Sequence, residues 1–190
     1  NRRWDALAHH TIFFSRDYKK EFHQIFKERR LAEDPTLYVA DTSAHDPGHA
    51  PAGGSNLFIL INTPHLTDPS RDDGRNPSPA SAAADGRWIQ EADRIVERLE
   101  RRGLEGLRAS IQTMDVITPH TFRDLYRSNG GSIYGTSSNS RFSAFMRPRN
   151  RHRRIAGLYF CGGSTHPGGG IPLVVLSAFH ACELIRRDVG

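Results

Sequence analysis

Two glycine clusters near the carboxyl end of the chain have the residue types and spacing of a ligand-binding turn. Gly162 and Gly163 follow a short apolar run, and a second cluster at residues 168–170 precedes Pro172 and a long apolar segment. We expect a buried strand at 157–161 and a buried helix after the turn, because proline suits the first helical turn. Glycine lets a ligand approach the backbone closely, and the free N–H groups of a helix start stabilise negative charge.

Three interpretations of this turn follow from the residues alone. Reduction of a flavin develops negative charge around its N1 and C2 carbonyl, and a helix start pointing there stabilises the reduced form. A phosphate fits the same electrostatics, although no lysine follows the glycines as it does in a nucleotide P-loop. The third interpretation is a turn that only joins a strand to a helix.

Other reactive residues form weaker patterns. His45 and His49 are four residues apart, but the Pro-Gly pair between them excludes a helix, so we predict no metal site. Cys161 and Cys182 fall in the predicted buried strand and helix, where inert packing is expected. His166, inside the turn, is expected either to contact a ligand or to make a structural hydrogen bond.

The composition limits the class of protein. The chain has 190 residues and a mass of 21.3 kDa, which suits one ordinary globular domain. No apolar stretch approaches the roughly 20 residues of a membrane-spanning helix. Its 2 cysteines exclude a disulfide scaffold and suit a reducing compartment. Because the first residue is Asn1, we expect a processed chain or a piece of a longer protein.

The net charge of +5 permits attraction to phosphate or anionic lipid. An arginine-rich run at 147–154 has no nucleic-acid-binding motif or aromatic platform, so we predict a solvated loop and no nucleic-acid partner, with phospholipid contact as the alternative. A basic helix predicted at 18–27 carries four apolar residues on one face. We expect this face to pack on a sheet, with a membrane surface as the alternative. The four are Tyr18, Phe22, Ile25 and Phe26.

Hydrophobic patterns predict the elements that must position the turn. We expect strands at 10–15, 36–40, 57–61 and 110–118, and the continuous apolar run at 57–61 predicts burial on both faces. A charged helix is predicted at 88–102, with a buried stripe of Ile89, Ala92, Val96 and Leu99. The resulting fold class is α+β, with a mixed β-sheet, flanking helices and a final strand–turn–helix unit.

The residue identities in the turn resemble the C-terminal signature of the bacterial-type carotenoid desaturases, which include phytoene desaturases and hydroxyneurosporene or methoxyneurosporene dehydrogenases of the FAD-dependent amine-oxidase superfamily. That signature is a tyrosine–phenylalanine strand, a small-residue turn, Thr-His-Pro-Gly-small-Gly-Ile-Pro and an apolar helix. Upstream, residues 131–135 resemble a Gly-x-x-Tyr-Gly element of these enzymes and of retinol saturases. The matching residues are Leu158-Tyr159-Phe160, Gly162-Gly163-Ser164 and Thr165-His166-Pro167-Gly168-Gly169-Gly170-Ile171-Pro172.

The resemblance implies FAD as the cofactor. Gly162 and Gly163 would approach its ribityl-phosphate region. The residues expected at its isoalloxazine end are Gly170, Ile171, Pro172, Leu173 and Val174.

The resemblance also implies desaturation of a lipophilic polyene, with FAD accepting a hydride and oxygen or a quinone reoxidising it. The catalytic base stays unassigned. The implied location is cytoplasmic, with peripheral contact at the inner face of the cytoplasmic membrane as an extension. Candidate lining residues for an apolar tunnel are Phe58, Ile59, Ile61, Phe142 and Phe145.

One feature of the family is missing from this sequence. These enzymes bind ADP through an N-terminal G-x-G-x-x-G, which the chain does not contain. We therefore expect a C-terminal part that is inactive alone. In it, residues 1–127 belong to a substrate-binding domain, 128–156 are connecting loops, and 157–190 are the last segment of a Rossmann-like FAD-binding domain. The alternatives are a non-catalytic basic binding or scaffold domain, a carotenoid isomerase, or a retinol saturase-like enzyme.

Overall fold

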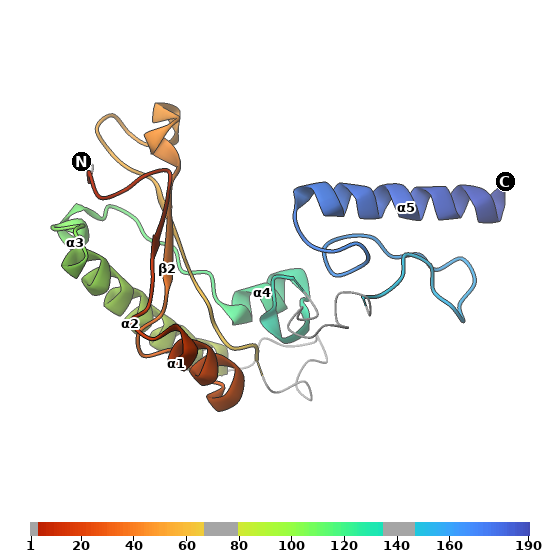
Figure 1. The fold of residues 1–190 in the computed structure, drawn as a ribbon, viewed down its shortest axis with the longest axis horizontal. Coiled ribbons are helices and arrows are strands. Elements are labelled where there is room, and N and C mark those ends of the chain that lie inside the picture. The colour runs from red at the N-terminus through yellow and green to blue at the C-terminus, as the bar shows by residue number, and fades with distance from the viewer. Residues whose placement is uncertain (1–3, 67–79, 135–146) are drawn as a thin grey trace. The chain divides into compact units, whose positions relative to one another are not determined.

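The computed structural model describes residues 4–66, 80–134 and 147–190 (Figure 1). It separates the chain into two compact units, Asn1–Gly131 and Ser132–Gly190. The first unit contains all three described strands and four α-helices, and the second is built around one long helix. The α+β class is confirmed by these elements, and each unit is described below by itself.

The sheet of the first unit has three strands in the order β1-β2-β3. These strands are β1 (His10–Phe13), β2 (Leu37–Asp41) and β3 (Leu57–Ile61), close to the predicted ranges. Both pairings are antiparallel, so the prediction of a mixed sheet is wrong for the described residues.

The fourth predicted strand, at 110–118, does not form. Helix α3 (Leu107–Ser110) occupies its start, and the chain is then irregular until α4 (Pro119–Tyr126). Met114 and Ile117 of this segment are exposed. The loose alternation of apolar residues therefore has no sheet neighbour to pair with, which is what a strand requires.

One face of the sheet forms the core with α2 (Ala80–Arg101). Leu37 and Val39 of β2 pack against Val96 and Leu99 of α2, and all four are almost fully buried. The predicted helix is confirmed, but Ile89 is 52% exposed and does not belong to the buried stripe. The stripe instead includes the buried Glu91, so the helix faces the sheet at a different angle from the predicted one.

The other face of the sheet is open within the described part of this unit. The prediction that β3 is buried on both faces is wrong, because Phe58 is 54% and Leu60 41% exposed. Ile59 and Ile61 point to the opposite face and pack against the core. Leu60 lies in register with Tyr38 and Ile12, so this open face carries a continuous apolar row across all three strands.

The predicted helix at 18–27 is α1 (Tyr18–His23) followed by a π-helical turn, η1 (Gln24–Glu28). Asp17 caps its start by accepting a hydrogen bond from the Lys20 N–H at 2.9 Å. Only Ile25 of the predicted apolar face is buried. The aromatic rings of this face form a row of successive contacts, in the order Phe14, Tyr18, Phe22 and Phe26.

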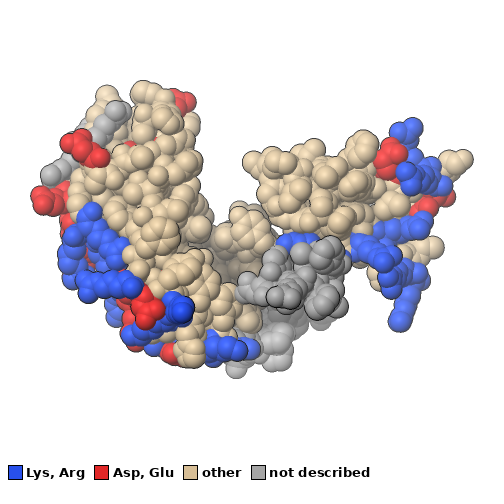
Figure 2. Space-filling model, in the orientation of Figure 1, with Lys and Arg blue, Asp and Glu red and all other residues tan. Residues whose placement is uncertain are grey.

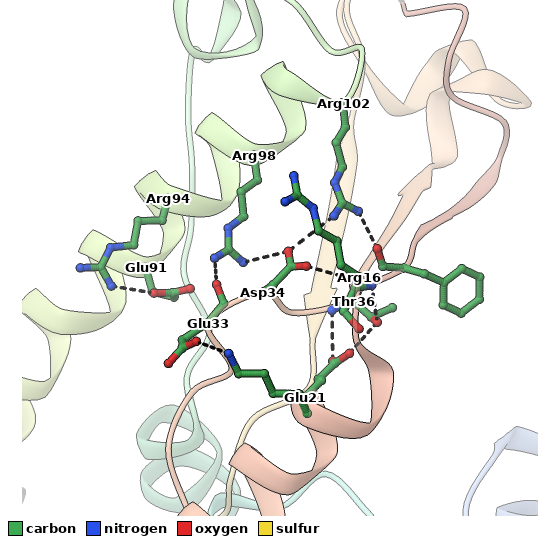
Figure 3. A network of polar contacts seen from close by, with 12 residues as sticks. Arg16, Glu21, Glu33, Asp34, Thr36, Glu91, Arg94, Arg98 and Arg102 are labelled. Atoms are coloured by element: carbon green, nitrogen blue, oxygen red, sulfur yellow. Dashed lines mark hydrogen bonds and ion pairs between the residues drawn. The ribbon is translucent and has the colours of Figure 1, made fainter.

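A polar network joins α1, residues 33–36 and α2 (Figure 3). The buried Glu21 carboxylate accepts hydrogen bonds from the Thr36 N–H at 3.1 Å and hydroxyl at 2.7 Å. From α2, Arg102 donates to the Phe14 carbonyl at 2.8 Å, and Arg98 donates to the Glu33 carbonyl. The network satisfies polar groups that the small core cannot exclude, and it holds α1 against the rest of the unit.

The second unit contains α5 (Ile171–Val189), which confirms the predicted terminal helix. The predicted strand at 157–161 is reduced to one bridge, between Arg151 and Tyr159. The helix was expected to be buried, but Ser177 and Ala181 are its only buried residues among those described, since the loop and turn of this unit cover one narrow stripe. In the described parts of the chain, no helix is long and apolar enough to cross a membrane.

Candidate cofactor-binding site

The glycine-rich turn of the second unit runs from Gly162 to Gly170 and ends at the start of α5. Gly162 has φ 116° and Gly170 has φ 97°, values that favour glycine. A Cβ built on either residue would have no heavy atom within 4 Å. At both positions the backbone therefore borders open space, which a ligand could occupy.

The two glycine clusters meet in space, as the sequence motif required. A Cβ on Gly163 would lie 3.6 Å from the Cα of Gly169 and 3.7 Å from a methyl group of Val174. The first turn of α5 begins with Gly170 as its N-cap, and the Val174 N–H donates to the Gly170 carbonyl at 2.9 Å. The N–H groups of Ile171 and Leu173 precede the first helical hydrogen bond and contribute positive potential at this end of the helix, whereas Pro172 has no N–H.

Arg147 adds a full positive charge to the turn. Its guanidinium donates to the Gly163 carbonyl at 3.2 Å and fills the space in front of Gly168, where a Cβ would lie 3.2 Å from the guanidinium carbon. This residue was predicted to lie in a solvated basic loop. Its contact with both glycine clusters could not be predicted from the sequence, because it depends on how the arginine-rich loop folds against the turn.

Asn150 and Ser177 form buried hydrogen bonds to the turn and to each other. Both side chains are buried, with 6% and 0% exposure. The Asn150 amide nitrogen lies 3.1 Å from the Phe160 carbonyl, 3.0 Å from the His166 carbonyl and 3.0 Å from the Ser177 hydroxyl. Neither residue was predicted to matter. The one available signal was an asparagine inside an arginine-rich run.

The Tyr159 end of the motif is tied to the last turn of α5. The Tyr159 hydroxyl donates to Asp188 at 2.6 Å, and Arg151 makes an ion pair with the other carboxylate oxygen at 2.6 Å. The Tyr159 hydrogen bond and the Arg151 charge lower the pKa of Asp188. This contact ties the segment, where a strand was expected, to the terminal helix.

His166 contributes to the turn through its backbone. Its N–H donates to the Pro148 carbonyl at 2.9 Å, and its carbonyl accepts from Asn150 and Ser177. These backbone contacts give His166 a structural part in the turn, and its expected contact with a ligand stays a prediction. Cys161 and Cys182 are both exposed, so the prediction that they are buried is wrong. The reason is that the expected strand at 157–161 does not form, and the helix that carries Cys182 is covered along one narrow stripe only.

The upstream Gly-x-x-Tyr-Gly element contacts the same turn. A Cβ on Gly169 would lie 2.8 Å from the ring of Tyr134, so the ring needs a glycine there. Tyr134 and Gly169 belong to the same unit, and their contact brings together two motifs that are distant in the sequence. Of the predicted tunnel residues, Phe58 is on the open sheet face, Ile59 and Ile61 are core, and 142 and 145 lie outside the described residues.

Charge is unevenly distributed along α5. Most of the helix has an uncharged surface, and charged side chains gather toward its C-terminal end (Figure 2). Apolar residues of its first turns are exposed, including Leu173 at 40% and Val174 at 36%. Across residues 4–66, 80–134 and 147–190, no group of three His, Cys, Asp or Glu side chains could hold a metal ion. The arrangement is a positive helix start beside an apolar wall.

Comparison with known proteins gives a consistent assignment. The chain is 37% identical over 189 residues to a 4,4'-diapolycopene oxygenase of Methylomonas sp, covering 100% of this chain and 35% of that protein. It is 39% identical over 188 residues to a 1-hydroxycarotenoid 3,4-desaturase of Flavobacterium sp., covering 97% and 35%. It is 36% identical over 193 residues to a lycopene-forming phytoene desaturase of Pseudescherichia vulneris, covering 100% and 36%. No protein-family model matches the chain.

The resemblance to the carotenoid desaturases is therefore confirmed, and the similarity extends beyond the glycine-rich motifs along the whole chain. The chain is homologous to one part of each of these proteins and spans about a third of the length of the curated relatives it matches. The named reactions of these relatives include both desaturation and oxygenation of carotenoids.

Proposed function

We propose that the chain is part of an FAD-dependent oxidoreductase that desaturates a carotenoid or a related polyene. The observation that carries this proposal is the meeting of Gly163, Gly169 and Val174 at the start of α5, in a chain homologous to carotenoid desaturases. FAD, when bound, supplies a two-electron acceptor for the hydrogen removed from the substrate.

The residues of the turn fit the chemistry of a flavin. Gly162 and Gly170 leave open backbone that a flat ligand can approach, whereas any L side chain at these φ values would be strained. The free amides of the α5 start favour negative charge, as a reduced flavin requires. Arg147 adds positive charge to the same turn through its contacts with Gly163 and Gly168.

The polyene would contact the open face of the three-stranded sheet. Ile12, Phe58 and Leu60 offer exposed apolar side chains there, and a hydrocarbon gains free energy by covering them. Ile59 and Ile61 are excluded from this role because they pack into the core. Oxygen or a quinone would reoxidise the cofactor, and the enzyme would work in the cytoplasm at the inner membrane surface, where a lipophilic substrate resides.

The oxygenase names among the relatives favour a second candidate reaction, oxidation of a diapocarotenoid. Both reactions are tested on the protein encoded by the complete reading frame that contains this chain. The protein is purified, its flavin absorbance measured, and liposomes containing phytoene, a 1-hydroxycarotenoid or 4,4'-diapolycopene are supplied. We expect bound FAD and a product with extended conjugation. An oxygenated product supports the second candidate, and a colourless protein that leaves every substrate unchanged contradicts both.

Gly170→Asp tests the electrostatic part of the proposal. The matched control is Gly170→Asn, which has the same shape and suffers the same backbone strain at φ 97° without the charge. A negative charge at the N-cap should oppose negative charge on the reduced flavin. We expect the aspartate variant to bind FAD at least about fivefold more weakly than the asparagine variant, and to have a lower reduction potential. Equal FAD affinity and equal reduction potential in the two variants would contradict a flavin position at the start of α5.

A further inference from the structure

We propose that Asn150 and Ser177 are positioning residues for the cofactor-binding turn, acting together as a buried clamp that sets the two open glycines before the cofactor arrives. This inference rests on the proposed function for its ligand. The clamp itself rests on contacts within the second unit.

The clamp joins three segments at one buried point. Asn150 comes from the basic loop and Ser177 from the second turn of α5. The third segment supplies two backbone acceptors, the Phe160 carbonyl just before the glycine-rich turn and the His166 carbonyl within it. The Phe160 N–H donates back to the Asn150 carbonyl at 2.8 Å, so this asparagine holds the turn through both its side chain and its backbone.

The Asn150 amide is a donor surrounded by acceptors. In addition to the Phe160 and His166 carbonyls, it faces the Ser177 carbonyl at 3.3 Å and the Ser177 hydroxyl at 3.0 Å. Its two hydrogens are shared among these four oxygens. Replacing the amide nitrogen by a carboxylate oxygen would set like charges against each other in a buried site, with almost no change of shape.

Ser177 completes the clamp by donating and accepting at once. Its hydroxyl donates to the His166 carbonyl at 2.8 Å and accepts from the Gly162 N–H at 3.2 Å. The N–H of Gly162 is thus fixed to α5 next to the open face of that glycine, and Gly170 is the N-cap of the same helix. The Ser177 hydroxyl therefore ties the first open glycine to the helix whose N-cap is the second.

A turn fixed in advance binds its ligand more tightly, because ordering the backbone does not have to be driven by binding. Glycine makes this effect large, since nine described glycines have positive φ and four of them lie at 157–170. A flexible turn of this composition would otherwise lose much conformational entropy when the cofactor binds.

The test uses the protein from the complete reading frame, with and without FAD. Asn150→Asp is compared with Asn56→Asp, an identical change at an exposed asparagine of the first unit. Ser177→Thr is compared with Ser177→Val, because valine has nearly the same volume as threonine but lacks the hydroxyl. FAD affinity is measured by fluorescence titration. Hydrogen exchange of the Gly162 and His166 amides is measured without FAD.

We expect Asn150→Asp to weaken FAD binding at least tenfold and to accelerate exchange of both amides at least tenfold, with no change in Asn56→Asp. Ser177→Thr should bind FAD at least threefold more tightly than Ser177→Val, a difference that a purely space-filling role would not produce. If Asn150→Asp fails to fold, the comparison of the two Ser177 variants still tests the clamp.

Unchanged exchange in Asn150→Asp, or equal FAD affinity of the two Ser177 variants, would overturn the clamp. Failure of the proposed function has a different signature. In that case the unmodified protein binds no FAD, while the exchange rates still report whether the clamp holds the turn.

Discussion

Gly131→Ala should destabilise the first unit strongly, because the structure leaves no room for a side chain there. Gly131 is buried, has φ 69°, and a Cβ on it would lie 2.2 Å from the Pro119 carbonyl oxygen and 2.7 Å from the carbonyl carbon. Pro119 is the first residue of α4, whose N-cap Thr118 is 3% exposed and locked in a capping box with Thr121. Neither backbone can move without breaking hydrogen bonds.

The size of the effect follows from these contacts. An alanine in the left-handed region costs about 1–2 kcal/mol. Relieving the clash also disrupts the Gly131 N–H bond to the Ser128 carbonyl or the α4 cap, at about 1 kcal/mol for each lost bond. We expect the free energy of unfolding to fall by about 3 kcal/mol.

Gly130→Ala is the matched control for this prediction. Gly130 has φ 60°, so an alanine there bears the same left-handed cost of about 1–2 kcal/mol. Its Cβ would lie 3.3 Å from the Leu66 carbonyl oxygen, a much milder contact than the 2.2 Å approach at Gly131. Urea unfolding is followed by tryptophan fluorescence, because Trp4 and Trp88 both lie in the first unit. Equal loss of stability in the two variants would refute the steric reasoning.

Two further predictions concern pH and association. Hydrogen bonds from Lys20 and then Arg30 lower the pKa of Glu33 to about 2 from 4.5, so its stabilising contribution is complete above pH 4.5 and is lost as pH falls toward 2. At low salt, Glu33→Gln should make the urea midpoint of the first unit less sensitive to pH between 4.5 and 2. A pH profile equal to that of the unmodified protein would show that the ion pairs of Glu33 do not stabilise the fold. The 190-residue chain alone should elute in gel filtration above its 21.3 kDa mass, without stoichiometric FAD, because Ile171, Val175 and Phe179 expose 83%, 64% and 60% of their surfaces. A monodisperse monomer carrying one FAD would contradict this expectation.

Local patterns in the sequence were sufficient for most elements of the fold. Three strands, the two long helices and the start of α5 at a Gly-Ile-Pro step were all predictable, because strand alternation, helical periodicity and the fixed φ of proline act over a few residues. The family was also recognisable from the Thr-His-Pro-Gly segment, since a motif of that length is specific without any knowledge of its surroundings.

Burial and pairing were decided only by the tertiary structure. The apolar run at 57–61 has the same letters whether one or both faces of the strand are covered, and only the position of α2 shows that Phe58 is exposed while Ile59 is core. Asn150 and Ser177 are 27 residues apart in the sequence, and only the fold brings their side chains together beside the glycine-rich turn. Hydrogen bonds between distant segments depend on how the chain returns to itself, and a single sequence does not record that path.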